Sequence, residues 1–153
     1  YGVGDSFDPD KSHVISGLIK KLHEAKVRKK KKMTIWGTGK PIREFLYVDD
    51  AANICIQIMN IKKKIINRIT KPQLSQINIG TGKGISIKKL AEMISKVVGY
   101  KGKLLFNEKY PDGHPKKIGN IKKQIYLIGN IAKVSLKDGI KKTYLDFLHR
   151  TKN

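Results

Sequence analysis

The sequence predicts a mixed α/β fold, because segments with the apolar spacing of α-helices alternate with short apolar runs typical of β-strands. The predicted order is helix, strands, helix, strand, helix, strand and helix. The 153 residues fall within the size range of one domain, and no internal repeat or linker divides them. We therefore expect one compact unit, whose topology the sequence leaves open.

The first predicted helix spans residues 13–29, where apolar side chains recur with the period of one helix face and lysines occupy the other. It follows a loop over residues 1–12 that ends at Ser12, a residue type suited to capping a helix. Residues 33–36 predict a short strand that ends in a tight glycine-rich turn. Residues 44–48 predict a second strand.

A second helix is expected after Asp49 or Asp50, because aspartate is a favourable N-terminal cap. We expect its apolar side chains to face inward, with Cys55 as a small buried residue. Lys62–Lys64 should close it against the negative end of the helix dipole. An irregular segment is expected at 65–76 and a strand at 76–79. A third helix should run from its cap Ser86 to Gly99, where it ends, and a strand should follow at 103–106. After a loop at 107–120, a final helix should begin with the capping box Ser135–Asp138.

The formal net charge of +21 suggests a polyanionic partner such as nucleic acid. The composition weakens this interpretation. Of the 33 basic residues, 29 are Lys and only four are Arg, whereas base-edge and bidentate phosphate recognition favour Arg. Lys and Ile together make up 51 of the 153 residues, as expected from an AT-rich genome. We favour compositional drift and expect no nucleic-acid partner.

The sequence has no run that approaches the roughly 18 apolar residues of a membrane-spanning helix, so we expect no membrane partner. The single cysteine has no partner for an internal disulfide, which fits a reducing compartment and predicts a cytoplasmic protein. The chain begins at Tyr1 without a methionine or a signal peptide, and we expect it to be cut from a longer protein.

The sequence lacks the features of a self-sufficient dinucleotide enzyme. The two Gly-x-Gly turns, at Gly37–Gly39 and Gly80–Gly82, have no third glycine, since Ile42 and Ile85 occupy its place. None of the six tyrosines has a lysine four residues later, the couple that supplies the proton in one large class of reductases. We therefore expect these residues alone to be inactive in hydride transfer.

Several motifs occur in an order that resembles one known family. They are Ser12-His13-Val14-Ile15 after the loop Asp5-x-Phe7-x-Pro9, the block from Trp36 to Asp50 with the pattern W-G-T-G-x-P-x-R-E-F-L-x-V-D-D, and Pro111-Asp112-Gly113. Together they are similar to the motifs of the GDP-L-fucose synthase family, in the extended short-chain dehydrogenase/reductase superfamily. The block from Trp36 alone indicates the superfamily, and the other two motifs narrow it. The resemblance covers residues 1 to about 118 and resumes in the last helix.

The resemblance implies that residues 1–153 are the C-terminal substrate-binding portion of an NAD-dependent epimerase/dehydratase-type domain whose N-terminal Rossmann half is missing. It implies an enzyme that converts GDP-4-keto-6-deoxy-D-mannose to GDP-L-fucose by epimerisation at C3 and C5 and reduction at C4. NADPH is then the cofactor of the intact enzyme, and a homodimer is the expected assembly.

The resemblance assigns one catalytic residue, His13, as an acid or base in the epimerisation. It also makes His13 a cofactor-binding residue, and it implies no metal ligand. The alternative is that His13 only donates or accepts a hydrogen bond at the start of its helix. We expect a structural role for His23.

Four substrate-binding residues follow from the same resemblance: Lys21, Trp36, Arg43 and Asp112. Arg43 has a guanidinium that can grip a diphosphate with two hydrogen bonds, and its alternative is a surface arginine. Lys21 stands where the family usually has arginine. It keeps the positive charge but cannot form the two parallel hydrogen bonds of a guanidinium. Trp36 either presents the face of its indole ring to the nucleotide sugar or packs in the core. Asp112 either accepts hydrogen bonds from sugar hydroxyls or only shapes a turn.

Two other functions remain open. Another nucleotide-sugar enzyme of the same superfamily would prefer UDP or dTDP over GDP. A non-enzymatic basic module would bind DNA with a steep salt dependence. The sequence also departs from the family between residues 118 and 130, where an acidic and an aromatic residue are lost, and we expect altered packing there.

Overall fold

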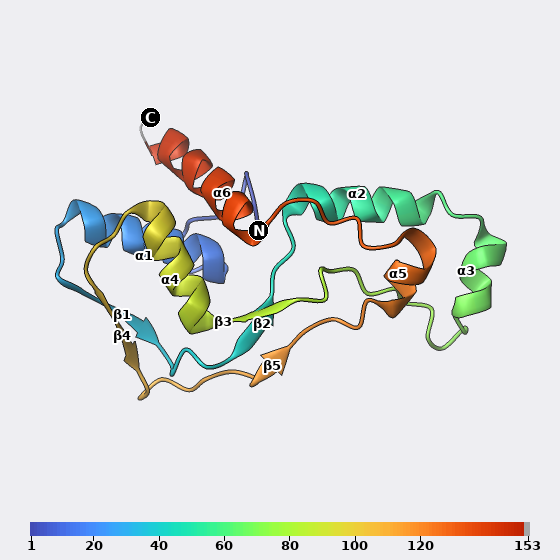
Figure 1. Ribbon diagram of the computed structural model, residues 1–153, viewed down its shortest axis with the longest axis horizontal. Helices are drawn as coiled ribbons and strands as arrows, with labels where there is room; N and C mark the ends of the chain where they lie inside the picture. The colour runs from blue at the N-terminus through green and yellow to red at the C-terminus, as the bar shows by residue number, and fades with distance from the viewer. Residues whose placement is uncertain (152–153) are drawn as a thin grey trace.

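The computed structural model describes residues 1–151, which form six helices and five short strands (Figure 1). In chain order they are α1 (Val14–Val27), β1 (Lys32–Trp36), β2 (Ile42–Glu44), α2 (Val48–Met59), α3 (Lys63–Ile69), β3 (Gly84–Ser86), α4 (Ile87–Val98), β4 (Lys103–Asn107), β5 (Lys116–Lys117), α5 (Lys122–Ile128) and α6 (Leu136–Thr151). The predicted α/β class is confirmed.

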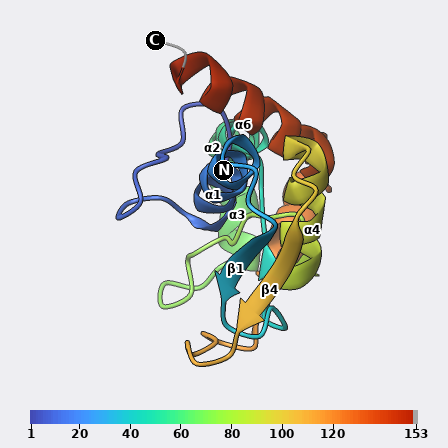
Figure 2. The ribbon, with the colours of Figure 1, turned by 90° about the vertical axis from the view of Figure 1, so that its left-hand side faces the viewer.

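Helices α1, α4 and α6 pack together at one end of an elongated molecule (Figure 1). Their apolar faces form the core, in which Ile15, Ile19 and Leu22 of α1 meet Leu90 and Ile94 of α4 with at most 1% of each residue exposed. The parallel strands β1 and β4 lie side by side below these helices (Figure 2). This end of the molecule thus has two layers, one of helices and one of sheet.

The pleat of β1 decides which of its side chains reach the core. The parallel register places Met33 opposite Leu104 and Ile35 opposite Phe106. Met33 and Ile35 are buried, whereas Lys32, Thr34 and Trp36 alternate with them on the exposed side. Because side chains along a strand point alternately to its two faces, Trp36 must point away from the core.

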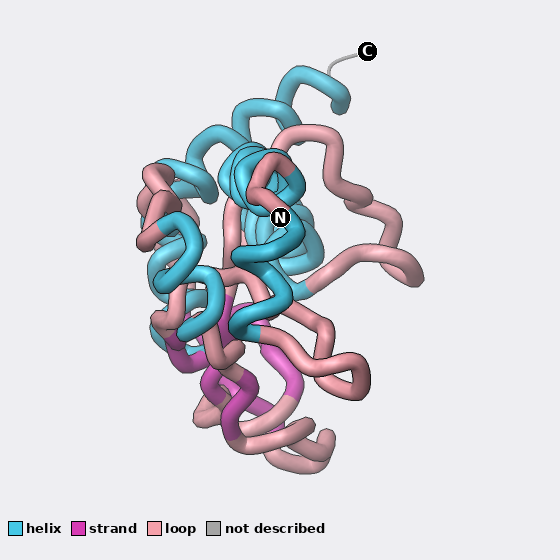
Figure 3. The backbone as a smooth tube through the Cα atoms, turned by 90° about the vertical axis from the view of Figure 1, so that its right-hand side faces the viewer, coloured by secondary structure: helices cyan, strands magenta, loops and turns pink. Residues whose placement is uncertain are grey.

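A second, three-stranded sheet connects the two ends of the molecule. Its central strand β2 pairs antiparallel with β3 and parallel with β5. Arg43, in the middle of β2, therefore lies opposite Ile85 on one side and Lys117 on the other. Helices α2, α3 and α5 form the far end, and Figure 3, viewed from this end, shows the strands gathered below the helices.

The capping predictions for α4 and α6 are confirmed, whereas the expected cap of α1 at Ser12 is wrong, because the N-cap of α1 is His13. The Ser86 hydroxyl accepts a hydrogen bond from the Lys89 amide at 3.3 Å, and Gly99 ends α4 with a φ of 77°. Ser135 and Asp138 form the predicted box at the start of α6. The Ser135 hydroxyl accepts from the Asp138 amide at 3.1 Å and donates to its carboxylate at 2.6 Å. The helix predicted at 13–29 and the strands predicted at 33–36 and 103–106 are also present.

The predicted caps of α2 are wrong, and so is its expected closure by Lys62–Lys64, because α2 ends at Met59 and Lys63 begins α3. The N-cap of α2 is Tyr47, which makes no side-chain capping bond, and Asp49 and Asp50 lie in the first turn. The carboxylate of Asp50 instead accepts hydrogen bonds from the backbone amides of Lys133 at 3.1 Å and Val134 at 2.9 Å. Asp50 therefore ties α2 to the segment before α6, while both aspartates still favour the positive end of the helix dipole.

The apolar side of α2 is largely uncovered within residues 1–151. Ile54 is fully buried, but Ile56 is 58% exposed and Met59 is 82% exposed. The prediction that Cys55 is buried is wrong, because this thiol lies on the exposed surface of the helix. Helical spacing shows that a helix is amphipathic, but it does not show that a neighbour covers its apolar face.

Several predicted boundaries also differ from the structure. The strand expected at 44–48 is instead β2, which ends at Glu44, where its pairing with β3 ends. No strand forms at 76–79, and the strand of this region is instead β3, which pairs with β2. The segment 65–76, expected to be irregular, contains most of α3, and the loop predicted at 107–120 contains β5.

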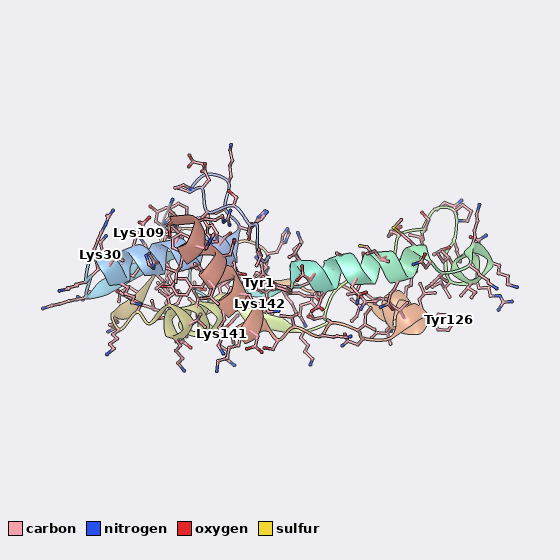
Figure 4. The ribbon with its side chains drawn as sticks, turned by 90° about the horizontal axis from the view of Figure 1, so that it is seen from above. Tyr1, Lys30, Lys109, Tyr126, Lys141 and Lys142 are labelled. Atoms are coloured by element: carbon pink, nitrogen blue, oxygen red, sulfur yellow. The ribbon has the colours of Figure 1, made fainter. Side chains whose placement is uncertain are left out.

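Lysine side chains extend outward around the whole molecule, as Figure 4 shows with Lys30 near one end and Lys141 and Lys142 near the middle. Tyr126 lies at the opposite end, on α5 (Figure 4). Within residues 1–151 no helix combines the length and the apolar character needed to cross a bilayer.

His23 couples stability to pH. Its Nδ1 lies 3.0 Å from the Tyr144 hydroxyl, and its ring packs edge-on against Phe147 with centroids 5.1 Å apart. Desolvation by burial lowers the pKa of His23 below its usual 6.5, and the nearby Lys26 ammonium lowers this pKa further. Between the lowered pKa and 6.5 the unfolded chain binds more protons than the folded chain, so stability falls as the pH drops through this window.

We predict that the thermal unfolding midpoint is highest above pH 6.5 and declines below it toward the lowered pKa of His23. His23→Gln keeps a polar side chain that does not titrate, so this variant should flatten the decline in pH-dependent melting curves. His149→Gln, on the exposed last turn of α6, is the matched control and should retain it. An equal pH dependence in the His23→Gln variant and the parent chain would contradict this assignment.

Candidate functional site

A cleft of about 570 Å³ opens between α1, the turn after β1 and the loop that precedes β5. Its wall includes all five predicted site residues: His13 and Lys21 from α1, Trp36 from the end of β1, Arg43 from β2 and Asp112 from the loop. These residues are up to 99 positions apart in the sequence, and only the folded chain brings them together.

One face of α1 lines the cleft. His13, Gly17, Lys21 and Glu24 recur on it with helical spacing, while the opposite face packs into the core. His13 is the N-cap of α1, and its exposed side chain makes no capping hydrogen bond. The alternative role of His13 as a helix-start hydrogen bonder is therefore not observed, and its imidazole is available to the cleft.

Trp36 is part of an aromatic platform beside the cleft. It is 64% exposed, so the alternative of a core tryptophan is wrong. Tyr110 stacks on the indole with ring centroids 4.7 Å apart and 12° between the ring planes. The Lys21 ammonium lies 4.9 Å from the indole centroid. The indole is therefore in contact with both an aromatic ring and a cation.

Arg43 is half-buried and held by two backbone carbonyls. Its Nη1 donates to the carbonyl of Ile42 at 2.9 Å and to that of His114 at 2.6 Å. These bonds use the donors of Nη1 and fix the orientation of the guanidinium. The donors on Nε and Nη2 form a second edge of the guanidinium, which can bind an oxyanion with two hydrogen bonds.

Asp112 shapes a turn, which was one of the two roles predicted for it. Its Oδ1 accepts from the Thr38 amide at 2.8 Å, and its Oδ2 accepts from the Thr38 hydroxyl at 2.5 Å. A Cβ at Gly37, which has a φ of 80°, would collide with this carboxylate, so the turn requires glycine there. The hydrogen bonds from Thr38 lower the pKa of Asp112, which keeps it ionised at neutral pH.

The second Gly-x-Gly turn is held in a similar way by Glu44, which sequence reasoning did not single out. Its Oε1 accepts from the amides of Thr81 and Gly82, both at 2.6 Å, and its Oε2 accepts from the Gly119 amide at 2.7 Å. A phosphate cradle requires free backbone amides. Amides of both turns are already bonded to carboxylates, so neither turn resembles such a cradle.

Sequence reasoning also missed Tyr110 and Glu24. Tyr110 directly precedes the Pro111-Asp112-Gly113 motif, and an aromatic residue beside that motif was its available signal. Glu24 follows Lys21 by three residues, so helical spacing alone places it on the same face of α1. Within residues 1–151 no group of three or more His, Cys, Asp or Glu side chains is arranged to hold a metal ion.

The segment between residues 118 and 130, where altered packing was expected, forms α5 and contacts α2. Gln124 is fully buried there. Its side-chain amide accepts from the Gly80 amide at 2.8 Å and donates to the Gly80 carbonyl at 3.2 Å. A polar clamp on the backbone therefore anchors this segment beside the turn that Glu44 holds.

Comparison with known proteins identifies related sequences. The model of the NAD dependent epimerase/dehydratase family matches residues 1–80. GDP-L-fucose synthase from Escherichia coli strain K12 is 41% identical over 148 residues, which are 97% of this chain and 46% of that protein. GDP-L-fucose synthase 1 from Arabidopsis thaliana is 40% identical over 144 residues, 94% of this chain and 42% of that protein. The chain thus spans less than half the length of these relatives.

Solved structures share the fold. A GDP-6-OMe-4-keto-L-xylo-heptose reductase from C. jejuni has a TM-score of 0.87 at 34% identity, and the match covers 100% of this chain and 52% of that one. A GDP-L-fucose synthetase from Naegleria fowleri with NADP bound has a TM-score of 0.85 at 25% identity, covering 100% of this chain and 45% of that one. The family model spans more than half of the chain, and the chain therefore belongs to the NAD dependent epimerase/dehydratase family.

Proposed function

We propose that residues 1–153 form the substrate-binding portion of a GDP-sugar epimerase-reductase that converts GDP-4-keto-6-deoxy-D-mannose to GDP-L-fucose with NADPH. The observation that carries this proposal is the cleft in which His13, Lys21, Trp36, Arg43 and Asp112 meet. The relatives named GDP-L-fucose synthase support the reaction, and the GDP-heptose reductase supports a GDP-sugar ligand. A cytoplasmic location and a homodimeric assembly are part of the same proposal.

Lys21 and Arg43 are the groups that we propose hold the diphosphate. To reach a phosphate, the Lys21 ammonium must leave the Trp36 indole, a cation–π contact worth about 0.5–1 kcal/mol at an exposed site. A charge-assisted hydrogen bond to a phosphate oxygen is worth about 1.5–3 kcal/mol. The exchange therefore favours the bound state. Arg43 is already oriented by its two carbonyl contacts, so it loses little conformational freedom on binding.

His13 is the group that we propose transfers protons at the sugar. Epimerisation beside a ketone requires a base that removes a carbon-bound proton and an acid that delivers one from the opposite face. An imidazole titrates near neutral pH and suits either task. His13 and Lys21 are separated by about 12 Å along the axis of α1, at about 1.5 Å per residue. This spacing leaves room for a sugar ring between the imidazole and the diphosphate.

The described residues do not fit the phosphates of NADPH. The amides at the two Gly-x-Gly turns are bonded to Asp112 and Glu44 and are not free to cradle a pyrophosphate. In the proposed reaction NADPH supplies the hydride that reduces the C4 ketone. His13 is the one residue that we propose contacts the cofactor, and the 153 residues alone should not catalyse the reduction.

A basic groove favours a second candidate function, the binding of a polyanion. A hollow of about 430 Å³ lies at the C-terminal ends of α1 and α4. Its charged lining consists of Lys26, Lys29, Lys30, Lys31, Lys101 and Lys103. The Lys26 ammonium donates to the carbonyl of Val98 at 2.9 Å, where the end of a helix favours a cation. Lys26 thus has a structural role in the groove, and we rank this function second.

We predict that Arg43→Lys weakens binding of the GDP-sugar by about 10-fold to 100-fold, because lysine offers no two-pronged fork for a phosphate. Lys21→Ala should weaken it less, since an exposed ammonium contributes less than a fixed guanidinium. Calorimetric titration of the full-length protein measures both losses. Arg68→Lys, on the last turn of α3, is the matched control and should bind normally. The opposite order of the two losses would show that the diphosphate clamp is misassigned.

We predict that His13→Gln suppresses solvent-deuterium exchange at C3 and C5 of the ketosugar by about 100-fold to 10,000-fold in the full-length enzyme. Hydride transfer to the unepimerised ketosugar should survive in part, because it does not require this proton transfer. Mass spectrometry of the recovered sugar nucleotide measures the exchange, with His149→Gln as the matched control. Exchange at the parent rate in a folded His13→Gln enzyme would remove His13 from the catalytic residues.

A further inference from the structure

Glu24 is an acidic residue of the cleft that the proposed roles leave unused. The cleft wall contains two carboxylates, those of Asp112 and Glu24. Both oxygens of Asp112 accept hydrogen bonds from Thr38. The ion pairs within residues 1–151 are Lys141 with Asp138 and Arg150 with Asp146. The Glu24 carboxylate takes part in none of the ion pairs or side-chain hydrogen bonds of this described part of the chain, although it is half-buried.

Glu24 lies beyond Lys21 on α1, on the side away from His13. His13, Lys21 and Glu24 follow one another on the cleft face, with Glu24 about 16 Å beyond His13 along the helix axis. A sugar nucleotide is also linear, in the order sugar, diphosphate, ribose and base. If the sugar lies at His13 and the diphosphate at Lys21, the base lies at the Glu24 end of the cleft.

We infer that Glu24 reads the guanine base of the substrate and determines the specificity of the cleft for guanine nucleotides. This inference rests on the proposed function. Guanine presents two adjacent donors, N1–H and the exocyclic amino group at C2, and one carboxylate can accept both. Adenine and cytosine present one donor beside an acceptor, and uracil presents one donor between two acceptors. A free carboxylate at the base end of the cleft therefore selects guanine.

The partial burial of Glu24 strengthens this selection. A charge-assisted hydrogen bond is stronger where water is partly excluded, so the half-buried carboxylate of Glu24 gains more from each donor than an exposed carboxylate would. A base that lacks the second donor would leave one carboxylate oxygen unpaired. The site therefore rejects such bases as well as attracting guanine.

Three nucleotides test the inference by calorimetric titration of the full-length protein. Inosine diphosphate lacks the amino group at C2, and xanthosine diphosphate has a carbonyl oxygen in its place. The parent protein should bind GDP about 10-fold or more tightly than inosine diphosphate, because one charge-assisted hydrogen bond is lost. This comparison requires no mutation, so it is independent of any folding defect in a variant.

Glu24→Gln reverses half of the hydrogen-bonding pattern that the site offers to the base. The side-chain oxygen of glutamine can still accept from N1–H, but its amide nitrogen donates toward the substituent at C2. This variant should bind GDP about 10-fold to 100-fold more weakly, lose the preference for GDP over inosine diphosphate, and bind xanthosine diphosphate more tightly than the parent protein does. Glu92→Gln makes the same chemical change on the exposed side of α4, away from the cleft, and should leave all three affinities unchanged.

The outcomes separate this inference from the proposed function. A Glu24→Gln protein with the parent affinity for GDP and the parent preference over inosine diphosphate would overturn the role of Glu24 alone. Equal parent affinities for GDP and inosine diphosphate would do the same. A parent protein that binds none of the three nucleotides would overturn the proposed function, and the inference with it.

Discussion

The hydrogen bonds between Asp112 and Thr38 are the contact on which the cleft depends. They join the turn after β1 to the loop before β5, and both segments position groups that we propose bind the substrate. Trp36 directly precedes the turn, and an aromatic ring of the loop stacks on it. The same loop supplies the carbonyl of His114 that orients Arg43. One carboxylate thus sets the relative positions of an indole and a guanidinium that belong to different sheets.

The strong positive charge of the chain and the chemistry of its cleft act at different ranges. A net charge of +21 attracts any anion, and this attraction is screened over about 10 Å at moderate salt. Such a field can speed the arrival of a nucleotide sugar but does not distinguish it from other polyanions. In the proposed function, discrimination comes from the few oriented groups of the cleft, among them the guanidinium of Arg43 and the carboxylate of Glu24.

The parts of the fold that could be predicted from the sequence depend on local chemistry, and the missed parts depend on contacts distant in sequence. Ser86 and Gly99 define the ends of α4 through bonds to near neighbours. The exposure of Cys55 depends on what covers α2, which no local pattern reveals. Glu44 was missed because its partners begin 37 residues later, at Thr81. Four of the five candidate residues of the cleft were found because short motifs carry them, and Lys21 was found from its position in the resembled family. Tyr110 and Glu24 had only weak local signals, and the folded chain was needed to place them at the cleft.

Mapping the binding of GDP by backbone amide NMR would test most directly whether the cleft is a GDP-sugar site. GDP should shift the signals of the cleft face of α1, the Trp36 indole and Arg43. Signals of the groove around Lys30 and Lys101 should remain in place. Shifts confined to that groove, equal in size for GDP and for a DNA oligonucleotide, would contradict the account and favour a polyanion-binding module.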